Sequence, residues 1–566
     1  MLCNGISFNK CEIATIIIGV ACLIVSIVTF CVFPVLYPKQ VVENLKFTQN
    51  YDGSLGYSAY QMSNPPMKNV MKFYFFNITN QDEMVYEGAQ PRLIETKAYA
   101  VIQSEQKRFM EFSEDGEQLY YENYKRYIIS KEHTCPECSW DDIVTFPNPT
   151  GVGAAANIYD PRYDITPIGR KILGFGLLLV GDYPFVSHTV KEVLFDGYND
   201  GLLTVGHSKI IRVLSDALNG GVSIIPIPVP PMPLLGFFQG YNNSKDEDYW
   251  VRTGKTDIDR LGEIVTWANV SSLPDYWWST PYARSIRGSD SASFCKMHLN
   301  EDDRLDFFQS FMCRSFTKTY LGKTVVHGIP AYTFSVPYEE YDSTANINAG
   351  FRYTNIEEVN YYPDWPSCPE RFPESCKNHS AVNCSLQENL CHDCCNMSYV
   401  DGTYLVPPGI FPLVCYPGRL KPTPFSVMYS PPHFVYSPPE MINSVVGLHP
   451  DIETHRPMVY NHEPYSGSVV EVFYRLQVSM PTMPVKGVVP NRDLPEKIIP
   501  IFWEDSHAVL KDYVYDKLWL GFVLVPKLVT AIEFTLLGVG VILLLLIALL
   551  QIWRRRRRPA DFMSEL

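Results

Sequence analysis

Two long, almost uncharged stretches lie near the two ends of the chain and limit what it can fold into. Residues 13–37 contain no charged residue, and residues 528–553 contain only Glu533. About 20 apolar residues cross the hydrocarbon core of a bilayer as a helix. The first stretch is too long for the apolar part of a signal peptide and lacks a small-x-small cleavage site. The sequence therefore predicts two transmembrane helices, 13–37 and 528–553, on either side of a large domain at 38–527.

The charges beside these stretches predict their orientation. Five consecutive arginines, Arg554 to Arg558, directly follow the second stretch. Positive charge next to a transmembrane helix marks its cytoplasmic side. With two spans, both tails (1–12 and 554–566) are then expected in the cytoplasm and residues 38–527 outside it. The arginines would act as a stop-transfer anchor, or alternatively attract anionic lipid.

Six N-glycosylation sequons agree with this topology, because all of them lie between the two stretches. A glycosylated sequon belongs to the exoplasmic part of a protein. The expected sites are Asn77, Asn242, Asn269, Asn378, Asn383 and Asn396.

Eleven of the 15 cysteines also lie between the stretches, seven of them crowded at 368–415. In an oxidising compartment disulfides are the default, and an odd number leaves one thiol over. The pairs Cys135/Cys138 and Cys391/Cys394 have the spacing of zinc ligands, but their separation exceeds that of a zinc ribbon, so no metal site is expected. The expected disulfide cysteines are Cys135, Cys138, Cys295, Cys313, Cys368, Cys376, Cys384, Cys391, Cys394, Cys395 and Cys415. Cys3 and Cys11, beside the first span, are palmitoylation candidates or plain thiols.

The residue types of the large domain favour strands and turns. The chain has 36 tyrosines and 44 prolines, which are enriched in strands and turns respectively. Short aromatic and β-branched runs predict strands at 71–76, 98–102, 108–112, 124–129, 325–336 and 468–479. No linker interrupts them, which favours one large antiparallel unit in an α+β fold. Residues 151–198 differ, with apolar stretches of helical length at 168–179 and 186–195.

The sequence gives no support for an enzyme or a nucleic-acid binder. A net charge of −14 disfavours general nucleic-acid binding. The chain has no H-E-x-x-H, no G-x-S-x-G and no P-loop motif. His433 and His455 are interpreted as structural loop residues. No catalytic residue, cofactor or metal is therefore predicted.

Eight short phrases occur in the order in which one protein family has them. They are Phe75-Phe-Asn-Ile-Thr-Asn, Gly240-Tyr-Asn-Asn-Ser, Cys313-Arg-Ser, Gly328-Ile-Pro-Ala-Tyr, Pro432-His-Phe, Gly447-Leu-His-Pro, Arg475-Leu-Gln-Val and Ile499-Pro-Ile-Phe-Trp. Together with the two spans they cover nearly the whole chain. The sequence resembles the class B scavenger receptor family, which includes a fatty acid translocase, a lipoprotein receptor and a lysosomal integral membrane protein.

The resemblance implies a fold. It implies an antiparallel β-barrel with an internal tunnel, a helical apex at 151–198 and a disulfide between Cys313 and Cys415. Ala283 stands where the family usually has another cysteine, and the cysteine-rich segment at 368–415 is longer than usual. The remaining cysteine pairings therefore stay open.

The resemblance also implies a function: capture of lipid or lipoprotein ligands at the apex and passage of lipid through the tunnel to the membrane. Family members that bind acidic ligands carry lysines near the tip, where this chain has Val180 and Asp182, so neutral lipid, sterol or free fatty acid is favoured. The candidate apex residues are Phe175, Leu177, Leu178, Leu179, Val180, Phe185 and Leu194, with Arg170 and Lys171 behind them; their alternative role is the core of a helical bundle.

A second interpretation is a lysosomal or trafficking receptor that binds a protein partner. The C-terminal tail, 559–566, contains no acidic dileucine signal, which favours the plasma membrane over the lysosome. The sequence leaves open a homo-oligomer.

Overall fold

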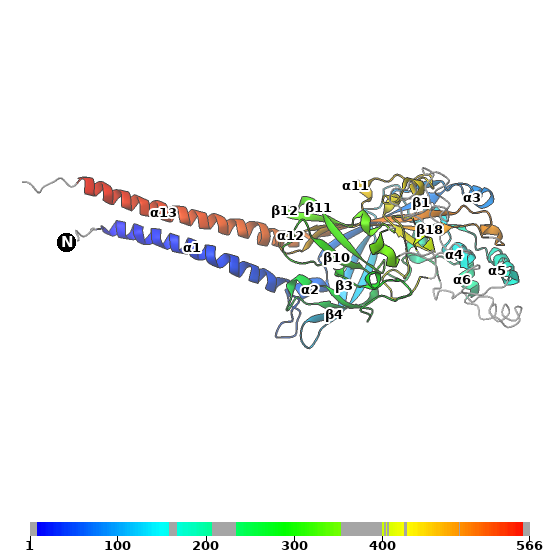
Figure 1. Cartoon of the computed structure of the whole chain (residues 1–566), viewed down its shortest axis with the longest axis horizontal. Coiled ribbons are helices and arrows are strands. Elements are labelled where there is room, and N and C mark those ends of the chain that lie inside the picture. Colours follow the sequence, from blue (N-terminus) through cyan, green and yellow to red (C-terminus); the bar gives the residue numbers. More distant parts are fainter. Residues whose placement is uncertain are drawn as a thin grey trace, which may run out of the picture. The chain divides into compact units, whose positions relative to one another are not determined.

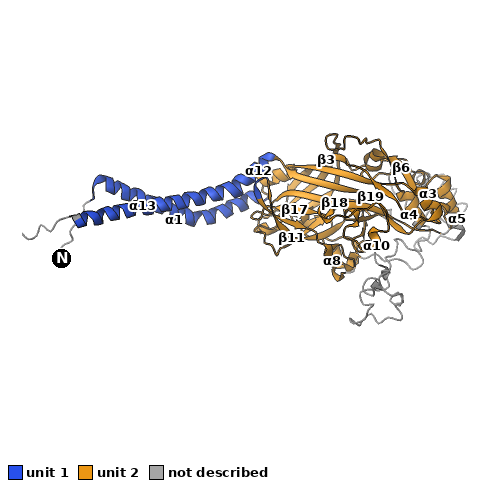
Figure 2. Cartoon of the chain, turned by 90° about the horizontal axis from the view of Figure 1, so that it is seen from above, with its two compact units in different colours: residues 1–46, 327–329, 512–566 blue, residues 47–326, 330–511 orange. Residues whose placement is uncertain are grey.

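The computed structural model describes residues 8–157, 167–206, 234–343, 345–351, 399–400, 403–404, 407–423, 427–485 and 487–557. The chain forms two compact units, coloured separately in Figure 2. Unit 1 comprises residues 1–46, 327–329 and 512–566, and unit 2 comprises residues 47–326 and 330–511.

Unit 1 consists mainly of two long apolar helices, α1 (Lys10–Leu45) and α13 (Val525–Arg557), which lie side by side (Figures 1 and 2). Helix α12 (Asp512–Trp519) and the π-helical turn η9 (Leu520–Leu524) precede α13. Most side chains of both long helices point outward, away from protein. Outward-facing apolar side chains suit a lipid environment. The two terminal apolar helices predicted from the sequence are confirmed, and both extend beyond the predicted spans.

Small and polar residues join α1 to α13. A Cβ added to Gly19 would lie 3.3 Å from the Gly540 carbonyl oxygen, so the backbones are close there. The Ser26 hydroxyl donates to the Glu533 carbonyl oxygen at 3.0 Å, and the Arg554 guanidinium pairs with Glu12 at 2.6 Å. Helices in lipid associate through such close approaches and hydrogen bonds.

Unit 2 is built around one large sheet whose twelve main strands follow one another in a curved path. In order across the sheet the strands are β8 (Ile264–Trp267), β7 (Ser244–Arg252), β4 (Gln118–Ile129), β3 (Tyr99–Phe112), β1 (Met67–Ile78), β19 (Lys497–Leu510), β18 (Val469–Thr482), β17 (Val459–His462), β12 (Ile329–Ser335), β11 (Arg314–Val326), β10 (Arg304–Gln309) and β9 (Ser289–Asp290). The neighbouring strands from β8 to β12 along this path are antiparallel, as are β10 and β11, whereas β9 and β10 are parallel.

The two edges of this path meet, so the sheet is a nearly closed barrel. Glu263, just before β8, forms an antiparallel bridge with Ser289 of β9. The Ile264 amide donates to the Gly288 carbonyl oxygen at 2.9 Å. Closure removes exposed sheet edges. The α+β fold with a large antiparallel barrel is confirmed.

Burial alternates along the barrel strands and identifies their inner face. On β4, Leu119, Tyr121, Asn123, Lys125 and Tyr127 are buried, while most residues between them are more accessible. Successive strand residues point to opposite faces, so these five point inward. The period-2 alternation of buried and accessible residues is therefore what identifies this segment as a barrel strand.

Shorter elements surround the barrel. The helices and turns are α2 (Tyr57–Ser63), α3 (Gln81–Glu87), α4 (Pro149–Asn157), α5 (Pro167–Leu179), η2 (Glu192–Asp196), α6 (Gly201–Gly206), η3 (Ile258–Arg260), α8 (Pro281–Arg284), η4 (Tyr338–Glu340), η5 (Asn346–Phe351), η7 (Pro432–Phe434), α10 (Pro439–Ile442), α11 (Ile452–His455) and η8 (Val489–Asn491). The short strands are β2 (Leu93–Glu95), β5 (Ile143–Pro147), β6 (Phe185–Thr189), β13 (Tyr399–Val400), β14 (Thr403–Tyr404), β15 (Phe411–Pro412) and β16 (Met428–Ser430).

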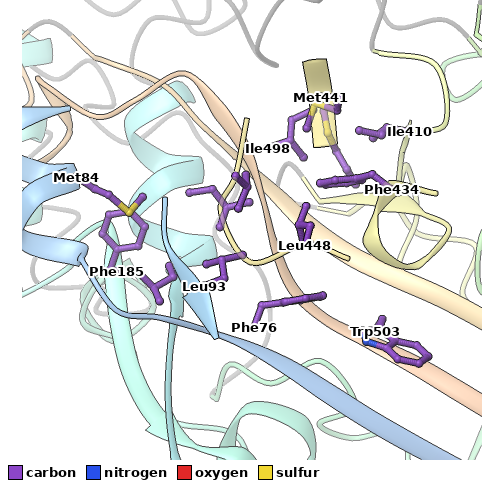
Figure 3. Close-up of a cluster of buried hydrophobic side chains, with 14 of the residues drawn as sticks. Phe76, Met84, Leu93, Phe185, Ile410, Phe434, Met441, Leu448, Ile498 and Trp503 are labelled. Atoms are coloured by element: carbon purple, nitrogen blue, oxygen red, sulfur yellow. The ribbon is translucent and has the colours of Figure 1, made fainter. Parts of the chain in front are cut away.

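One hydrophobic cluster joins these elements to the barrel (Figure 3). Phe185 of β6 lies beside Met84 of α3 and Leu93 of β2. At the other end of the cluster, Trp503 of β19 donates its indole N–H to the Glu95 carboxylate at 2.6 Å. This core fixes β6, and with it the segments that precede and follow β6, on the barrel.

Two disulfides are present among the described cysteines. They join Cys135 to Cys138, and Cys313 to Cys415 with Cα atoms 6.3 Å apart. Cys11 and Cys31 are exposed thiols, and Cys22 and Cys295 are half-buried ones. The other predicted cysteines, Cys3, Cys368, Cys376, Cys384, Cys391, Cys394 and Cys395, lie outside the described residues.

Candidate functional site

Three short helices gather at one end of unit 2, and we call them the apical helices: α4, α5 and α6 (Figure 1). Helix α4 contacts α6 and β18, and α5 contacts η8. Gly174 allows the last contact, because a Cβ there would lie 2.7 Å from the Gly487 carbonyl oxygen. Residues 186–195, expected from their apolar length to be helical, instead form β6 and the π-helical turn η2. β6 pairs with β5 throughout its length, and this tertiary pairing outweighs local preference.

Helix α5 presents an apolar face to solvent. Ile172 is 47% exposed, Phe175 62% and Leu179 72%. Their spacing of three and four residues places them on one side of the helix. Contiguous exposed apolar side chains mark interaction surfaces in soluble domains. This surface, Ile172, Phe175 and Leu179, is the α5 face.

The other predicted apex residues divide between core and surface. Leu177 is buried against Ala155, Met483, Val485 and Val488. Phe185 belongs to the hydrophobic cluster of Figure 3, and Leu194 is fully buried. Leu178 and Val180 are half-buried and Lys171 is exposed, whereas the side chain of Arg170 lies outside the described residues. The structure therefore places Phe175 and Leu179 together at the surface, and places Leu177, Phe185 and Leu194 in the packing beneath.

Asp182 does not sit at the exposed tip where the sequence comparison put it. Its side chain is 1% exposed and accepts hydrogen bonds from the Asn148 amide and the Thr150 hydroxyl. The Asn148 amide also donates to the Tyr183 carbonyl oxygen at 3.0 Å, which fixes its orientation. Asp200, the residue before α6, lies 2.6 Å from the same Thr150 hydroxyl. The two carboxyls therefore join α4, the turn after α5, and α6.

This arrangement requires a proton on the carboxyl pair. The Thr150 oxygen lies within 3.1 Å of three acceptors, on Asn148, Asp182 and Asp200. One hydroxyl supplies only one hydrogen, so a carboxyl proton must supply another. Burial, and then the neighbouring Asp200, raise the pKa of Asp182 to about 8, which agrees with a shared proton.

The inner face of the barrel carries a second group of buried ionisable residues. Lys107 pairs with Glu105 at 2.6 Å and donates to Asn123 at 2.9 Å. Lys125 pairs with Asp246 at 2.8 Å and lies 3.7 Å from Glu105. We call Glu105, Lys107, Lys125, Asp246, Asp290 and Glu504 the inner charged group; all but Glu105 are at least nine-tenths buried.

The carboxyls of this group differ in charge. Burial raises the pKa of Asp246 to about 7 and that of Glu504 to about 8, and it also raises the pKa of Asp290. The Lys107 and Lys125 ammonium groups lower the pKa of Glu105 to about 2, against the effect of burial. Glu105 is thus ionised, and Glu504 carries its proton at pH 7, whereas Asp246 keeps its pairing with the Lys125 ammonium group.

Sequence reasoning missed the inner charged group. Lys107 and Glu105 alternate in a strand pattern that is equally typical of a solvated face. Only the register of β3, β4 and β7 shows that Glu105, Lys125 and Asp246 meet. The available signal was the spacing of two residues on β4, by which Asn123 and Lys125 continue the inward-pointing positions of Leu119 and Tyr121.

His433 and His455 lie in a buried polar cluster on the outer side of β19. The His433 ring stacks on His455 with centroids 4.2 Å apart, and its Nε2 lies 3.3 Å from the Glu95 carboxylate. His433 Nδ1 accepts from the His449 amide at 3.0 Å. Burial lowers the pKa of His455 to about 4. Among the described residues no group of three or more His, Cys, Asp or Glu is arranged to hold a metal, and each histidine contact here fixes a loop.

Three of the predicted glycosylation sites are described. Asn269 and Asn242 are exposed and Asn77 is half-buried. Asn77 accepts from the Thr145 amide at 2.8 Å, and Asn242 accepts from the Tyr127 amide at 3.0 Å. Asn378, Asn383 and Asn396 lie outside the described residues.

The chain has relatives along nearly its whole length. It is 42% identical to an uncharacterized protein of Caenorhabditis elegans over 95% of this chain and 97% of that one. It is 23% identical to human Lysosome membrane protein 2 over 84% of this chain and 82% of the relative. It is also 23% identical to rat Scavenger receptor class B member 1, over 94% and 87%. The family model described as the CD36 family matches residues 17–551. With the barrel, the apical helices and the two terminal helices in place, the chain belongs to the CD36 family.

Proposed function

We propose that this protein captures lipid or lipoprotein ligands on the α5 face and passes their lipid through the barrel to the membrane. The observation that carries the proposal is the α5 face itself, with three apolar side chains about half or more exposed. Leaving such a surface in water is unfavourable by roughly 25 cal/mol per Å². A lipid surface or an acyl chain would cover it.

The route through the barrel is argued from solvation. An acyl chain loses about 0.8 kcal/mol of favourable transfer for each methylene exposed to water, so sixteen carbons face about 12 kcal/mol. A nearly closed sheet can shield the acyl chain from water over part of the distance to the membrane. Binding along such a route must stay weak enough for release.

The proposed location is the plasma membrane, with both tails in the cytoplasm and unit 2 outside. This orientation rests on the arginine run after the second span and on the positive-inside rule. The lysosomal membrane is the alternative location, because one relative is a lysosome membrane protein.

The test is uptake of a fluorescent long-chain lipid by cells that display the full-length protein. In the double variant F175D/L179D, charged groups replace two apolar contacts, and we expect uptake to fall about tenfold, equivalent to 1.4 kcal/mol. The matched control is L321D, a half-exposed leucine on β11 and outside the apical helices. Unchanged uptake by F175D/L179D at equal surface expression would refute capture at the α5 face.

A second candidate is a trafficking receptor that binds a protein on the same face. Exposed apolar residues spaced three and four apart on α5 also fit the apolar side of a partner helix. The two candidates separate by mass spectrometry of purified full-length protein. Co-purified lipid that F175D/L179D loses supports lipid capture; a stoichiometric protein lost in the same variant, with no lipid, supports the receptor.

A further inference from the structure

Strand β19 places one carboxyl on the inner face of the barrel without a partner. Phe502 packs against Phe73 and Phe237, with ring centroids 5.8 and 5.0 Å apart. Glu504, two residues on, points to the same face and lies opposite Phe73 in the β1–β19 register. It is 6% exposed, and within the described part of the chain no hydrogen bond or ion pair includes its carboxyl. Arg475 of β18 pairs instead with the adjacent Asp505 at 2.9 Å.

Two tyrosine hydroxyls near Glu504 also lack partners. The hydroxyl oxygens of Tyr127 and Tyr474 are buried and make no hydrogen bond to any residue that the structure describes. Tyr474 on β18 is diagonal to Glu504, because the register pairs Leu476 with Glu504. Tyr127 contacts the Phe238 ring at 5.5 Å, and Phe238 contacts Phe73 at 5.6 Å, directly across from Glu504.

The pKa values of the two tyrosines also indicate that Glu504, Tyr127 and Tyr474 lie close together. After burial, the Glu504 carboxyl is the largest influence that raises the pKa of Tyr474, and it contributes to the raised pKa of Tyr127. A buried polar atom without a hydrogen bond costs about 1–3 kcal/mol. The two tyrosine hydroxyls, which face one interior together with the buried Glu504 carboxyl, therefore require an explanation.

The surrounding charges restrict what can bind there. The inner charged group has four carboxyls, Glu105, Asp246, Asp290 and Glu504, against two lysines. Lys107 and Lys125 already pair with Glu105 and Asp246. A carboxylate ligand would find no free ammonium group among these residues, because each lysine already has a carboxyl partner.

We propose that Glu504, Tyr127 and Tyr474 form a hydrogen-bonding site inside the barrel for the uncharged hydroxyl head of a lipid, and that this site disfavours a carboxylate head. The inference rests on the proposed lipid passage and names the class of lipid that the passage favours. A hydroxyl group donates one hydrogen and accepts others, so it can satisfy the protonated Glu504 and a tyrosine together. A carboxylate cannot donate, and its burial carries a large desolvation cost.

The experiment compares two ligands with the same tail. Radiolabelled hexadecan-1-ol and hexadecanoate are bound to purified full-length protein at pH 7, where the acid is ionised. We expect the alcohol to bind about tenfold more tightly, as one or two hydrogen bonds imply. In Glu504→Leu the alcohol should lose about tenfold in affinity while binding of the acid does not fall.

Two further variants separate an effect on binding from an effect on folding. Glu504→Gln preserves shape and both hydrogen-bonding roles, and it should retain the preference for the alcohol. Glu111→Gln, at an exposed glutamate on β3, is the matched control and should behave as wild type. Equal binding of alcohol and acid by the wild-type protein, unaffected by Glu504→Leu, would overturn the site but leave lipid passage standing. Failure of both ligands to bind would overturn both proposals.

Discussion

At the scale of single residues, Asp182 and Asp200 share one hydroxyl donor, so their protonation controls how firmly three chain segments are held. A carboxyl whose pKa is raised on folding takes up a proton as the protein folds. For Asp182 the change is from about 3.8 to about 8. The stability that it contributes is fully present below pH 3.8 and is lost as the pH rises toward 8.

We therefore expect the apical helices to become less stable between about pH 4 and pH 8, by at most about 1.4 kcal/mol per pH unit. The other ionisable groups that face this pair among the described residues are Tyr198 and His188, whose rings stack 3.8 Å apart, and Glu192, 3.7 Å from His188. Hydrogen exchange of α4 and α6 as a function of pH measures the effect.

Asp182→Asn should flatten this pH dependence, because the amide supplies permanently the hydrogen that the carboxyl pair otherwise needs. Protection of α4 at pH 8 should then exceed that of the wild type. An unchanged pH profile in Asp182→Asn would show that the carboxyl pair holds no shared proton.

Residue roles of this kind could be predicted only in part from the sequence. Phe175 and Leu179 were predicted because they lie in an apolar stretch of helical length that the family resemblance assigns to the apex; the sequence did not separate them from the buried Leu177. Asp182 was placed at the tip by comparison with the family, and such a comparison does not reveal which way a side chain points. Glu504 was missed because its proposed role depends on Tyr127 and Tyr474, which come from strands distant in the sequence.

At the scale of elements, the meeting of β8 with β9 decides whether the sheet is a barrel or an open layer. Gly288 is central to this seam, since its carbonyl accepts from the Ile264 amide. It has φ +72°, and a Cβ there would collide with the Asp306 backbone. A left-handed conformation costs a residue with a Cβ about 1–2 kcal/mol.

We expect Gly288→Ala to lower the free energy of unfolding by about 2 kcal/mol or more, because the collision adds to the backbone strain. The denaturant midpoint of the full-length protein measures the loss. Gly322→Ala on β11 is the control, since a Cβ there meets nothing within 4 Å. Equal midpoints for the two variants would show that the seam tolerates a side chain.

The elements themselves were largely predictable. The aromatic and β-branched runs at 71–76 and 124–129 lie within β1 and β4, because alternation is read directly from neighbouring residues. Closure was not predictable from periodicity and came from the resemblance, because the seam pairs Glu263 with Ser289 through one isolated bridge. The π-helical turn η2 has no sequence signature that distinguishes it from an α-helix.

At the scale of the whole molecule, the chain is a membrane protein with two terminal spans and one large β-rich unit. Receptors of the CD36 family are not enzymes, so the prediction that this chain is not an enzyme is confirmed by its membership. The family likeness spans residues 17–551, and it was detectable from eight short phrases because each keeps its order along the chain.

Glycan mapping tests the proposed topology of unit 2. We expect Asn269 to be occupied, because it is exposed, and Asn77 to be occupied less, because it is half-buried and accepts from the Thr145 amide. Mass spectrometry of peptides from the full-length protein measures both. Asn269→Gln should remove one glycan. The absence of any glycan at Asn77, Asn242 and Asn269 would place unit 2 on the cytoplasmic side.

The neighbouring positions of β1 and β19 have a mechanical consequence. β1 enters the barrel at Met67 and β19 leaves it at Leu510, and these two residues pair with each other. On the N-terminal side the chain is already held at Phe47, whose amide donates to the Thr253 carbonyl oxygen at 3.0 Å, so β1 is protected from tension that arrives through α1. On the C-terminal side Leu510 is the last residue of β19 and is followed after one residue by α12. Tension applied through the C-terminal helix would therefore reach the β1–β19 ladder at its last pair.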